Sequence, residues 1–313
     1  MDALTGLLDG PRARSAFLLR CVMDAPWSIR IQDRAPLCLM AMVRGHAWVV
    51  PDRCDAVRLG AGDVAIARGP DPYSVADDPA TQPQVLILPG QRCVTPDGAE
   101  LAHTMRMGVR TWGNSRDGAT IMLVGVYELD SEVSQRLLRA LPALLTLPAA
   151  AWESPLIPLL GNEIVKDHPG QEAVLDRLLD RLLIAVLRAW FARPGAKTPR
   201  WYRAYDDPVV GRALRLLHHN PAHPWTVAEL AAATGVSRAA LARRFTDLVG
   251  EPPMTFLTGW RLALSADLLR DSDATLDAIA RQVGYGSSFA LSTAFKRVLG
   301  ISPQQHRASA PQP

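Results

Sequence analysis

The chain has 313 residues, of which 48% are apolar and 21% are charged, and its formal net charge is +3. This length accommodates two domains and a connector, and the composition is that of a globular protein. The low net charge excludes nucleic-acid binding through a global positive field, so any such contact has to come from local basic clusters.

Three features of the sequence indicate the cellular compartment of the protein. The first residues, MDALTGLLDGPRAR, have neither the basic start nor the apolar core of a signal peptide. Charged residues interrupt the longest apolar helical stretch, at 178–191, so we expect no membrane span. The four cysteines are widely spaced and form no CxxC pair, which argues against a zinc ribbon or a thioredoxin-like site. We expect a cytoplasmic protein with reduced thiols.

Short apolar runs separated by turn residues fill residues 1–130. They include Leu37–Val43, Val85–Leu88 and Ile121–Tyr127. The phrase RLGAGDVAIARG places a Gly-x-Gly-Asp turn between an apolar residue and an apolar strand, which predicts a hairpin in which glycine supplies the positive φ. This spacing of runs and turns predicts an all-β barrel or sandwich.

Residues 131–193 change to three- and four-residue spacing of apolar side chains, which predicts a helical connector. Its longest helix lies between Gly170 and Pro194. The wide apolar stripe of this helix either packs against the chain's own barrel or forms a homodimer interface through 170–193, and the pattern leaves both open. Pro, Gly and charged residues predict an exposed linker over 194–207.

Residues 208–307 contain one pattern twice. TVAELAAATGVSRAALARRFTDLVGEPP begins at Thr226, and TLDAIARQVGYGSSFALSTAFKRVLGISP begins at Thr275. Each copy has a capped helix, a glycine turn, a second capped helix and a glycine stop, which is typical of a helix-turn-helix. The predicted helices cover 208–219, 226–233, 237–249, 253–271, 275–283, 287–299 and 303–307.

The second helix of the first copy presents small and basic residues opposite its apolar face. Small side chains allow a helix to approach a DNA groove closely. Arg243 is placed to bond guanine bidentately, and the two arginines on the flanks suit phosphates. The predicted DNA-binding residues of this copy are Arg238, Ala239, Ala242, Arg243 and Arg244.

The second helix of the second copy is less basic. We expect its Ser and Thr residues to contact bases or thymine methyl groups, and its two basic residues to hold the backbone. The helix over 253–271 would space the copies so that both recognition helices enter successive major grooves, about 34 Å apart. The predicted DNA-binding residues of this copy are Ser288, Phe289, Ser292, Thr293, Lys296 and Arg297.

Residues 208–307 resemble the DNA-binding domain of the AraC/XylS family of bacterial transcription regulators. The stretch DAIARQVGYGSSFALSTAFKRVLGISPQQHR carries the C-terminal signature of that family, including the Gly-Tyr turn and the final Gly-Ile-Ser-Pro. Thr293 stands where many members have Arg, so we expect Arg243 and the first copy to carry most of the base discrimination. Upstream, MDALTGLL, CVMDAPW and LGAGDVAIARG together resemble the cupin-type sensor domain of one branch of these regulators.

The resemblance implies an α+β multidomain protein with a cupin-like β-barrel sensor domain over 1–130, a helical connector over 131–193 and a DNA-binding domain over 208–307. It implies a sequence-specific transcription regulator, more often an activator than a repressor, that binds double-stranded promoter DNA and works with RNA polymerase. A small-molecule or oxidant signal would act on the N-terminal domain. We expect no cofactor and no enzymatic activity.

An oxidant would act on cysteines. Arg20 adjoins Cys21 and Arg92 adjoins Cys93, so both thiols could have a lowered pKa and act as redox sensors. The alternative is that Cys21 and Cys38 are small buried hydrophobic residues, and this alternative is favoured.

A small molecule would need an apolar pocket, although aromatic side chains in a small barrel also form its core. Cupin enzymes hold a metal through clustered His and Glu, whereas His46 and His103 are isolated here, so we expect no metal site and no cupin oxygenase. The N-terminal half could also serve only for oligomerisation. The predicted pocket residues are Trp27, Met40, Trp48 and Tyr73.

Overall fold

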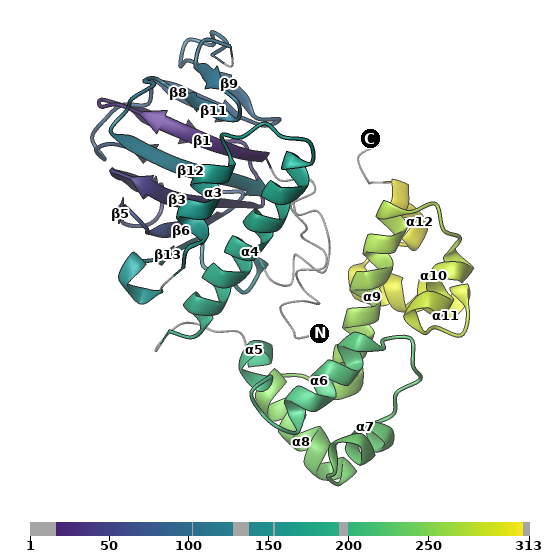
Figure 1. Ribbon diagram of the computed structural model, residues 1–313. Helices are drawn as coiled ribbons and strands as arrows, with labels where there is room; N and C mark the ends of the chain where they lie inside the picture. Colours follow the sequence, from purple (N-terminus) through teal and green to yellow (C-terminus); the bar gives the residue numbers. More distant parts are fainter. Residues whose placement is uncertain (1–16, 102, 128–137, 153, 194–199, 309–313) are drawn as a thin grey trace. The chain divides into compact units, whose positions relative to one another are not determined.

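The computed structural model describes residues 17–101, 103–127, 138–152, 154–193 and 200–308. Most of them form two compact units, a β unit within residues 17–193 and a helical unit within 200–308. The predicted α+β fold class is confirmed, because a β-rich part precedes an all-helical part with two helix-turn-helix pairs (Figure 1).

The strands of the described β unit form two sheets. One has the strand order β10-β11-β1-β12-β3-β6-β13, and the other has the order β5-β4-β7-β2-β8-β9. The first sheet consists of β1 (Phe17–Met23), β3 (Leu37–Arg44), β6 (Val64–Arg68), β10 (Arg106–Gly108), β11 (Thr111–Gly113), β12 (Thr120–Tyr127) and β13 (Leu144–Leu147). The second consists of β2 (Ser28–Ile31), β4 (His46–Pro51), β5 (Val57–Gly60), β7 (Tyr73–Ala76), β8 (Val85–Leu88) and β9 (Arg92–Val94).

The core of the β unit lies between the two sheets. Successive side chains of a strand point to opposite faces. Met40 and Met42 of β3 and Met122 of β12 therefore join Val49 of β4 and Val75 of β7 in one buried cluster. A turn forms at RLGAGD, where the side chain of Asp63 accepts the backbone N–H of Gly60 at 2.7 Å. The expected hairpin is wrong, because β5 and β6 on either side of the turn belong to different sheets.

The helices α3 (Leu156–Glu163) and α4 (Gln171–Phe191) cover the outer face of the seven-stranded sheet (Figure 1). Gly125 of β12 leaves room for Leu179 of α4, since a Cβ at Gly125 would stand 2.8 Å from the Leu179 side chain. The Tyr127 hydroxyl donates to the Leu179 carbonyl at 3.2 Å. A short 3₁₀ turn, η2 (Ala149–Ala151), precedes α3.

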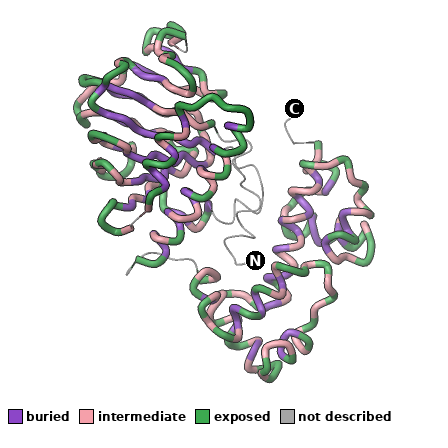
Figure 2. Tube along the Cα trace, in the orientation of Figure 1, coloured by how far each residue is buried: buried purple, intermediate pink, exposed green. Residues whose placement is uncertain are grey.

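The apolar stripe of α4 is buried within the chain itself. The stripe therefore packs against the chain's own β unit, and a homodimer through 170–193 stays a prediction. Figure 2 shows these buried positions on the side of α4 that meets the sheet. The buried apolar residues of α4 are Leu175, Leu179, Leu182, Leu183, Val186, Leu187, Trp190 and Phe191.

Two segments differ from their predicted character. The connector is not helical throughout, because β13 within it pairs with β6 and buries Leu145 and Leu147. The part of the predicted linker that the structure describes holds a short helix, α5 (Arg200–Ala204), whose Ala204 is buried in the core of the helical unit. Of the predicted connector and linker, residues 131–137, 153 and 194–199 lie outside the described residues.

The remaining helices confirm the predicted ones to within two residues at each end. Each recognition helix and the helix before it end at a glycine with positive φ. None of the helices in the described part of the chain has the length and apolar character needed to cross a membrane. These helices are α6 (Val210–His219), α7 (Val227–Thr234), α8 (Arg238–Val249), α9 (Pro253–Asp271), α10 (Leu276–Val283), α11 (Ser288–Leu299) and α12 (Pro303–Ala308).

The helix α9 belongs to two cores. Its first half contributes Phe256 and Leu257 to the cluster around α7 and α8. Its second half contributes Leu262, Ala266 and Leu269 to the cluster around α10 and α11. One continuous helix therefore carries both helix-turn-helix pairs, and its 19 residues extend for about 28 Å.

Candidate DNA interface and β-unit cavity

Side-chain caps fix the first helix-turn-helix. The Thr226 backbone N–H donates to the Glu229 carboxylate at 2.8 Å, and the Glu229 N–H donates to the Thr226 hydroxyl at 3.1 Å. This is the predicted capping box. The Ser237 hydroxyl accepts the N–H of Ala240 at 3.2 Å and so caps α8. Gly235 makes the turn between the helices at φ 73°.

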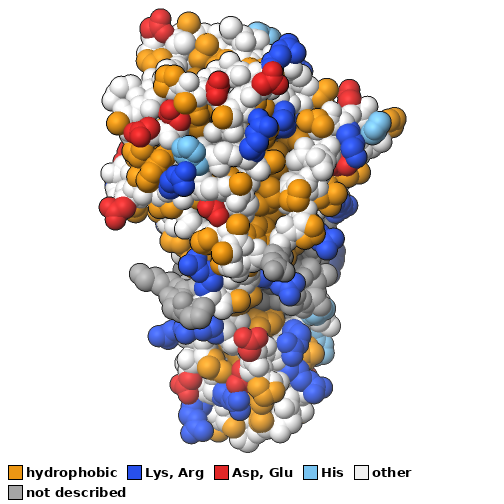
Figure 3. All heavy atoms as spheres, turned by 60° about the vertical axis from the view of Figure 1, so that its left-hand side comes forward, with side chains coloured by type: hydrophobic (Ala, Val, Ile, Leu, Met, Phe, Trp, Pro, Cys, Tyr) orange, Lys and Arg blue, Asp and Glu red, His pale blue; other side chains and the backbone are white. Residues whose placement is uncertain are grey.

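The outward face of α8 carries the predicted pattern. Arg238, Ala239 and Arg243 are exposed and Ala242 is half-buried, whereas Leu241 on the opposite face is fully buried. Lys and Arg side chains stand at the lower end of Figure 3, the level at which α7 and α8 lie in Figure 1. A small-residue surface flanked by guanidinium groups is therefore exposed on this helix.

Arg244 has a structural partner that the sequence did not indicate. Its Nη2 and Nε lie 2.6 Å and 2.9 Å from one carboxylate oxygen of Asp207. The other oxygen accepts the backbone N–H groups of Val209 and Val210. Partial burial alone would raise the pKa of Asp207, but these N–H groups and Arg244 lower it. Arg244 thereby ties α8 to the start of α6, and a phosphate contact of Arg244 would compete with this ion pair.

The second helix-turn-helix repeats the caps of the first. Thr275 caps α10 and Ser287 caps α11 through their hydroxyl groups. The six predicted residues of this copy all lie on α11. Phe289, Thr293, Lys296 and Arg297 are exposed, and Ser288 and Ser292 are half-buried.

A single arginine of α9 bridges the two helix-turn-helix pairs. The Nε of Arg261 donates to the Pro221 carbonyl at 2.7 Å, and its Nη2 donates to the His223 carbonyl at 2.8 Å. Both carbonyls lie in the loop between α6 and α7. The guanidinium carbon stands 5.9 Å from the ring centroid of Tyr285, in the turn between α10 and α11. Arg261 thus contacts the loop that leads into the first pair and the turn of the second pair at once.

Gly284 brings the second turn against the same loop. Its φ is +89°, and a Cβ on it would stand 2.6 Å from the Ala222 carbonyl oxygen. Any other residue would be strained here and would push the loop away. The Gly-Tyr turn of the sequence motif therefore also serves as a contact between the two helix-turn-helix pairs.

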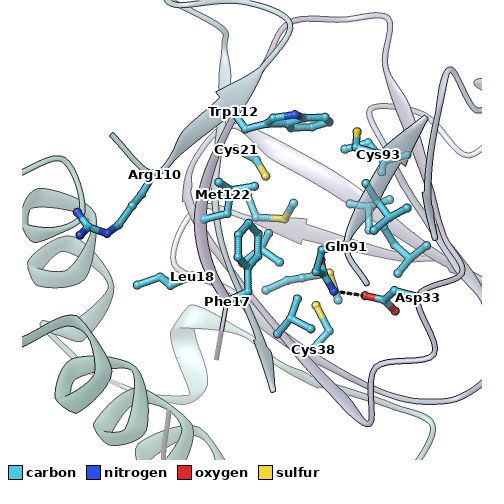
Figure 4. Close-up of a pocket in the computed structure, with 18 of the residues that line it drawn as sticks. Phe17, Leu18, Cys21, Asp33, Cys38, Gln91, Cys93, Arg110, Trp112 and Met122 are labelled. Atoms are coloured by element: carbon cyan, nitrogen blue, oxygen red, sulfur yellow. Dashed lines mark hydrogen bonds between the residues drawn. The ribbon is translucent and has the colours of Figure 1, made fainter. Parts of the chain in front are cut away.

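The β unit contains a cavity of about 370 Å³ between its two sheets. Its wall is mainly apolar, with Trp112 at one end and Met122 and Val124 along β12. Figure 4 shows Phe17 among the lining residues, and the Gln91 amide donating to Asp33 at 3.0 Å at one side of the cavity. Sequence periodicity did not single out these residues, because the cavity is formed by strands that are distant in sequence.

Two of the four predicted pocket residues line the cavity and two do not. Met40 and Tyr73 line the cavity. Trp27 is buried in the same core cluster but is not a lining residue. Trp48 belongs to neither set, because Val49 beside it on β4 points into the core and successive strand residues face opposite ways.

Three cysteines of the β unit, Cys21, Cys38 and Cys93, have a raised thiol pKa. Burial raises the pKa of Cys21 and of Cys38 to about 12, and burial and Glu100 raise that of Cys93 to about 11. The expected lowering by neighbouring arginines is wrong. Arg20 and Cys21 are successive residues of one strand and point to opposite faces, and Arg92 pairs with Glu100 at 2.8 Å. Redox sensing by Cys21 and Cys93 stays a prediction.

The described residues contain no group of three or more His, Cys, Asp or Glu side chains that could hold a metal ion. His46 lies half-buried on β4, and its backbone carbonyl accepts the Thr120 hydroxyl at 3.1 Å. His103 is exposed.

Comparisons with known proteins find similar families for both the β-rich part and the helical part of the chain. A cupin family model matches residues 2–192, and a helix-turn-helix domain model matches residues 230–309. An AraC-like transcription regulator of Streptomyces antibioticus is 32% identical over 98% of this chain and 98% of its own. Another, of Streptomyces lividans, is 31% identical over 100% of both. A crystal structure of the DNA-binding domain of AdpA with a target DNA is 35% identical, covers 33% of this chain and 92% of its own, and has a TM-score of 0.31.

From the contacts of Arg261 we predict how Arg261→Ala changes the binding of a DNA site that has two half-sites. We expect the wild-type chain to lose affinity sharply when one or two base pairs are inserted between the half-sites. The variant should lose much less on insertion, because the two helix-turn-helix pairs are no longer held in register. Band-shift titrations on DNA with altered spacing measure this. Arg212→Ala removes an equal charge from exposed α6 surface and serves as the control. An unchanged spacing preference in Arg261→Ala would contradict the bridge.

Proposed function

This chain belongs to the AraC family of DNA-binding transcription regulators, and from that premise we propose that it activates transcription when a small molecule occupies its β unit. In this proposal the helical unit binds promoter DNA in the bacterial cytoplasm, and the activated form works with RNA polymerase. The chain carries out no reaction of its own.

The proposal for base recognition rests on the exposed face of α8. Arg243 stands among small side chains, with Ala239 exposed and Ala242 half-buried beside it. This surface lets the helix backbone approach a major groove and lets the guanidinium reach O6 and N7 of a guanine. Arg238, at the start of the helix, is suited to a phosphate instead.

Arg243→Ala tests this assignment. The change should cost about 1–3 kcal/mol of binding free energy on the selected site and little on random DNA, because it removes a base contact. Fluorescence anisotropy of the full chain on both DNAs, at several salt concentrations, measures the two losses. Arg238→Ala should weaken binding to both DNAs alike and lower the salt dependence. An equal loss on both DNAs for Arg243→Ala would make Arg243 a phosphate contact.

The cavity of the β unit supports a small-molecule signal. Its volume of about 370 Å³ lies within the range of ligand pockets, roughly 300–1,000 Å³. The wall is mainly apolar, and its polar residues are Asp33 and Gln91, which are hydrogen-bonded to each other, together with Arg106, Arg110 and Thr111. A raised thiol pKa keeps Cys21 protonated near neutral pH, and a protonated thiol is a poor nucleophile. These observations favour a small apolar molecule over an oxidant as the signal.

An apolar fluorescent probe tests the cavity. N-phenyl-1-naphthylamine should bind the wild-type chain with increased fluorescence, and Val124→Trp should abolish most of that binding, because the indole fills space on the cavity wall. Val174→Trp is the matched control, since Val174 is 45% exposed on α4 and lies away from the cavity. Equal probe binding by both variants would contradict the assignment of the cavity as a ligand site.

A further inference from the structure

The recognition helix of the second helix-turn-helix exposes a large apolar side chain at its N-terminal end. Phe289 is the second residue of α11, and its side chain is 80% exposed. Residues at the N-terminal end of such a helix are the ones that contact base edges in helix-turn-helix complexes. The Phe289 side chain therefore lies at the end of the helix where contacts with DNA bases are expected.

The polar groups beside Phe289 are already engaged within the protein. The backbone N–H of Ser288 donates to the Asp277 carboxylate at 3.3 Å, and a hydrogen bond from the Ser288 side chain lowers the pKa of Asp277. The Thr293 hydroxyl donates to the Phe289 carbonyl at 2.9 Å. The exposed apolar groups left at this end of the helix for contact with a base are the Phe289 ring and the Thr293 methyl group, beside the half-buried Ser292.

The charges around this patch indicate DNA as its occupant. Lys296 and Arg297 are exposed in the last turn of α11, and Arg281 is exposed at the end of α10. Cationic side chains at these positions suit the phosphate backbone on either side of a groove. In the major groove, the apolar group that distinguishes one base from the others is the C5 methyl of thymine.

We propose that Phe289, together with the methyl group of Thr293, selects thymine through its C5 methyl group in the half-site bound by the second helix-turn-helix. The inference rests on the DNA binding of the helical unit and adds the chemistry of its second contact. The full site is then asymmetric. A guanine contact by Arg243 defines one half, and a thymine-methyl contact by Phe289 defines the other, one helical turn away.

Replacement of thymine by uracil tests the proposal, because it removes the methyl group and leaves every hydrogen-bonding group in place. Sites are first selected from random DNA with the full chain. Each thymine of the second half-site is then replaced singly by uracil. We expect about fourfold weaker binding at one or two positions, the effect of losing one buried methyl group. Thymines outside the protected site should show no effect.

Phe289→Ala should lose most of its preference for thymine over uracil while keeping its preference for guanine in the first half-site. Val298→Ala is the matched control, because Val298 is also exposed on α11, at 52%, but lies in its last turn. This control should keep the thymine preference. Because Phe289 contributes little to the core, its loss leaves the fold intact.

The outcomes separate this inference from the function on which it rests. Equal binding of thymine and uracil by the wild-type chain, a second half-site without thymine, or an unchanged thymine preference in Phe289→Ala overturns the inference alone. A wild-type chain that enriches no DNA sequence and shows no salt-dependent affinity overturns the proposed function as well.

Discussion

The geometry of the helical unit depends on the side chain of Arg261. Its guanidinium satisfies two backbone carbonyls of the loop before α7 and lies against Tyr285 in the turn before α11. Hydrogen bonds from a charged donor are among the stronger ones in proteins. The shared helix α9 sets the distance between the two recognition helices, and Arg261 with Gly284 sets their relative rotation. That contact adds to the two cores that already pack each helix-turn-helix pair on α9.

The sequence predicted those parts of the fold that short-range signals, such as capping residues and glycines, determine. Thr226, Ser237, Thr275 and Ser287 each cap a helix as expected, and the glycines that end the helices have positive φ, so helix bounds followed from the sequence. Long-range contacts could not be predicted in this way. Arg261 lies 40 residues from Pro221 and bonds its carbonyl, and no periodicity indicates such a pair.

The candidate site likewise has a part that short-range patterns predicted and a part that depends on long-range contacts. Helical spacing placed the exposed residues of α8 and α11 correctly, because a helix has one period and one outward face. It could not show that Arg244 pairs with Asp207, 37 residues away, or that Ser288 and Thr293 bond within the protein. In the β unit, Trp48 was expected in the pocket by residue type alone, whereas strand alternation directs it away. The cavity wall combines strands whose pairing the sequence does not specify.

The two helix-turn-helix pairs are expected to bind DNA as one rigid body. Hydroxyl-radical footprinting of the full chain on a selected site measures this. We expect two protected segments on one face of the duplex, with centres about 10–10.5 base pairs apart. A single protected half-site, or two segments on opposite faces of the duplex, would contradict it.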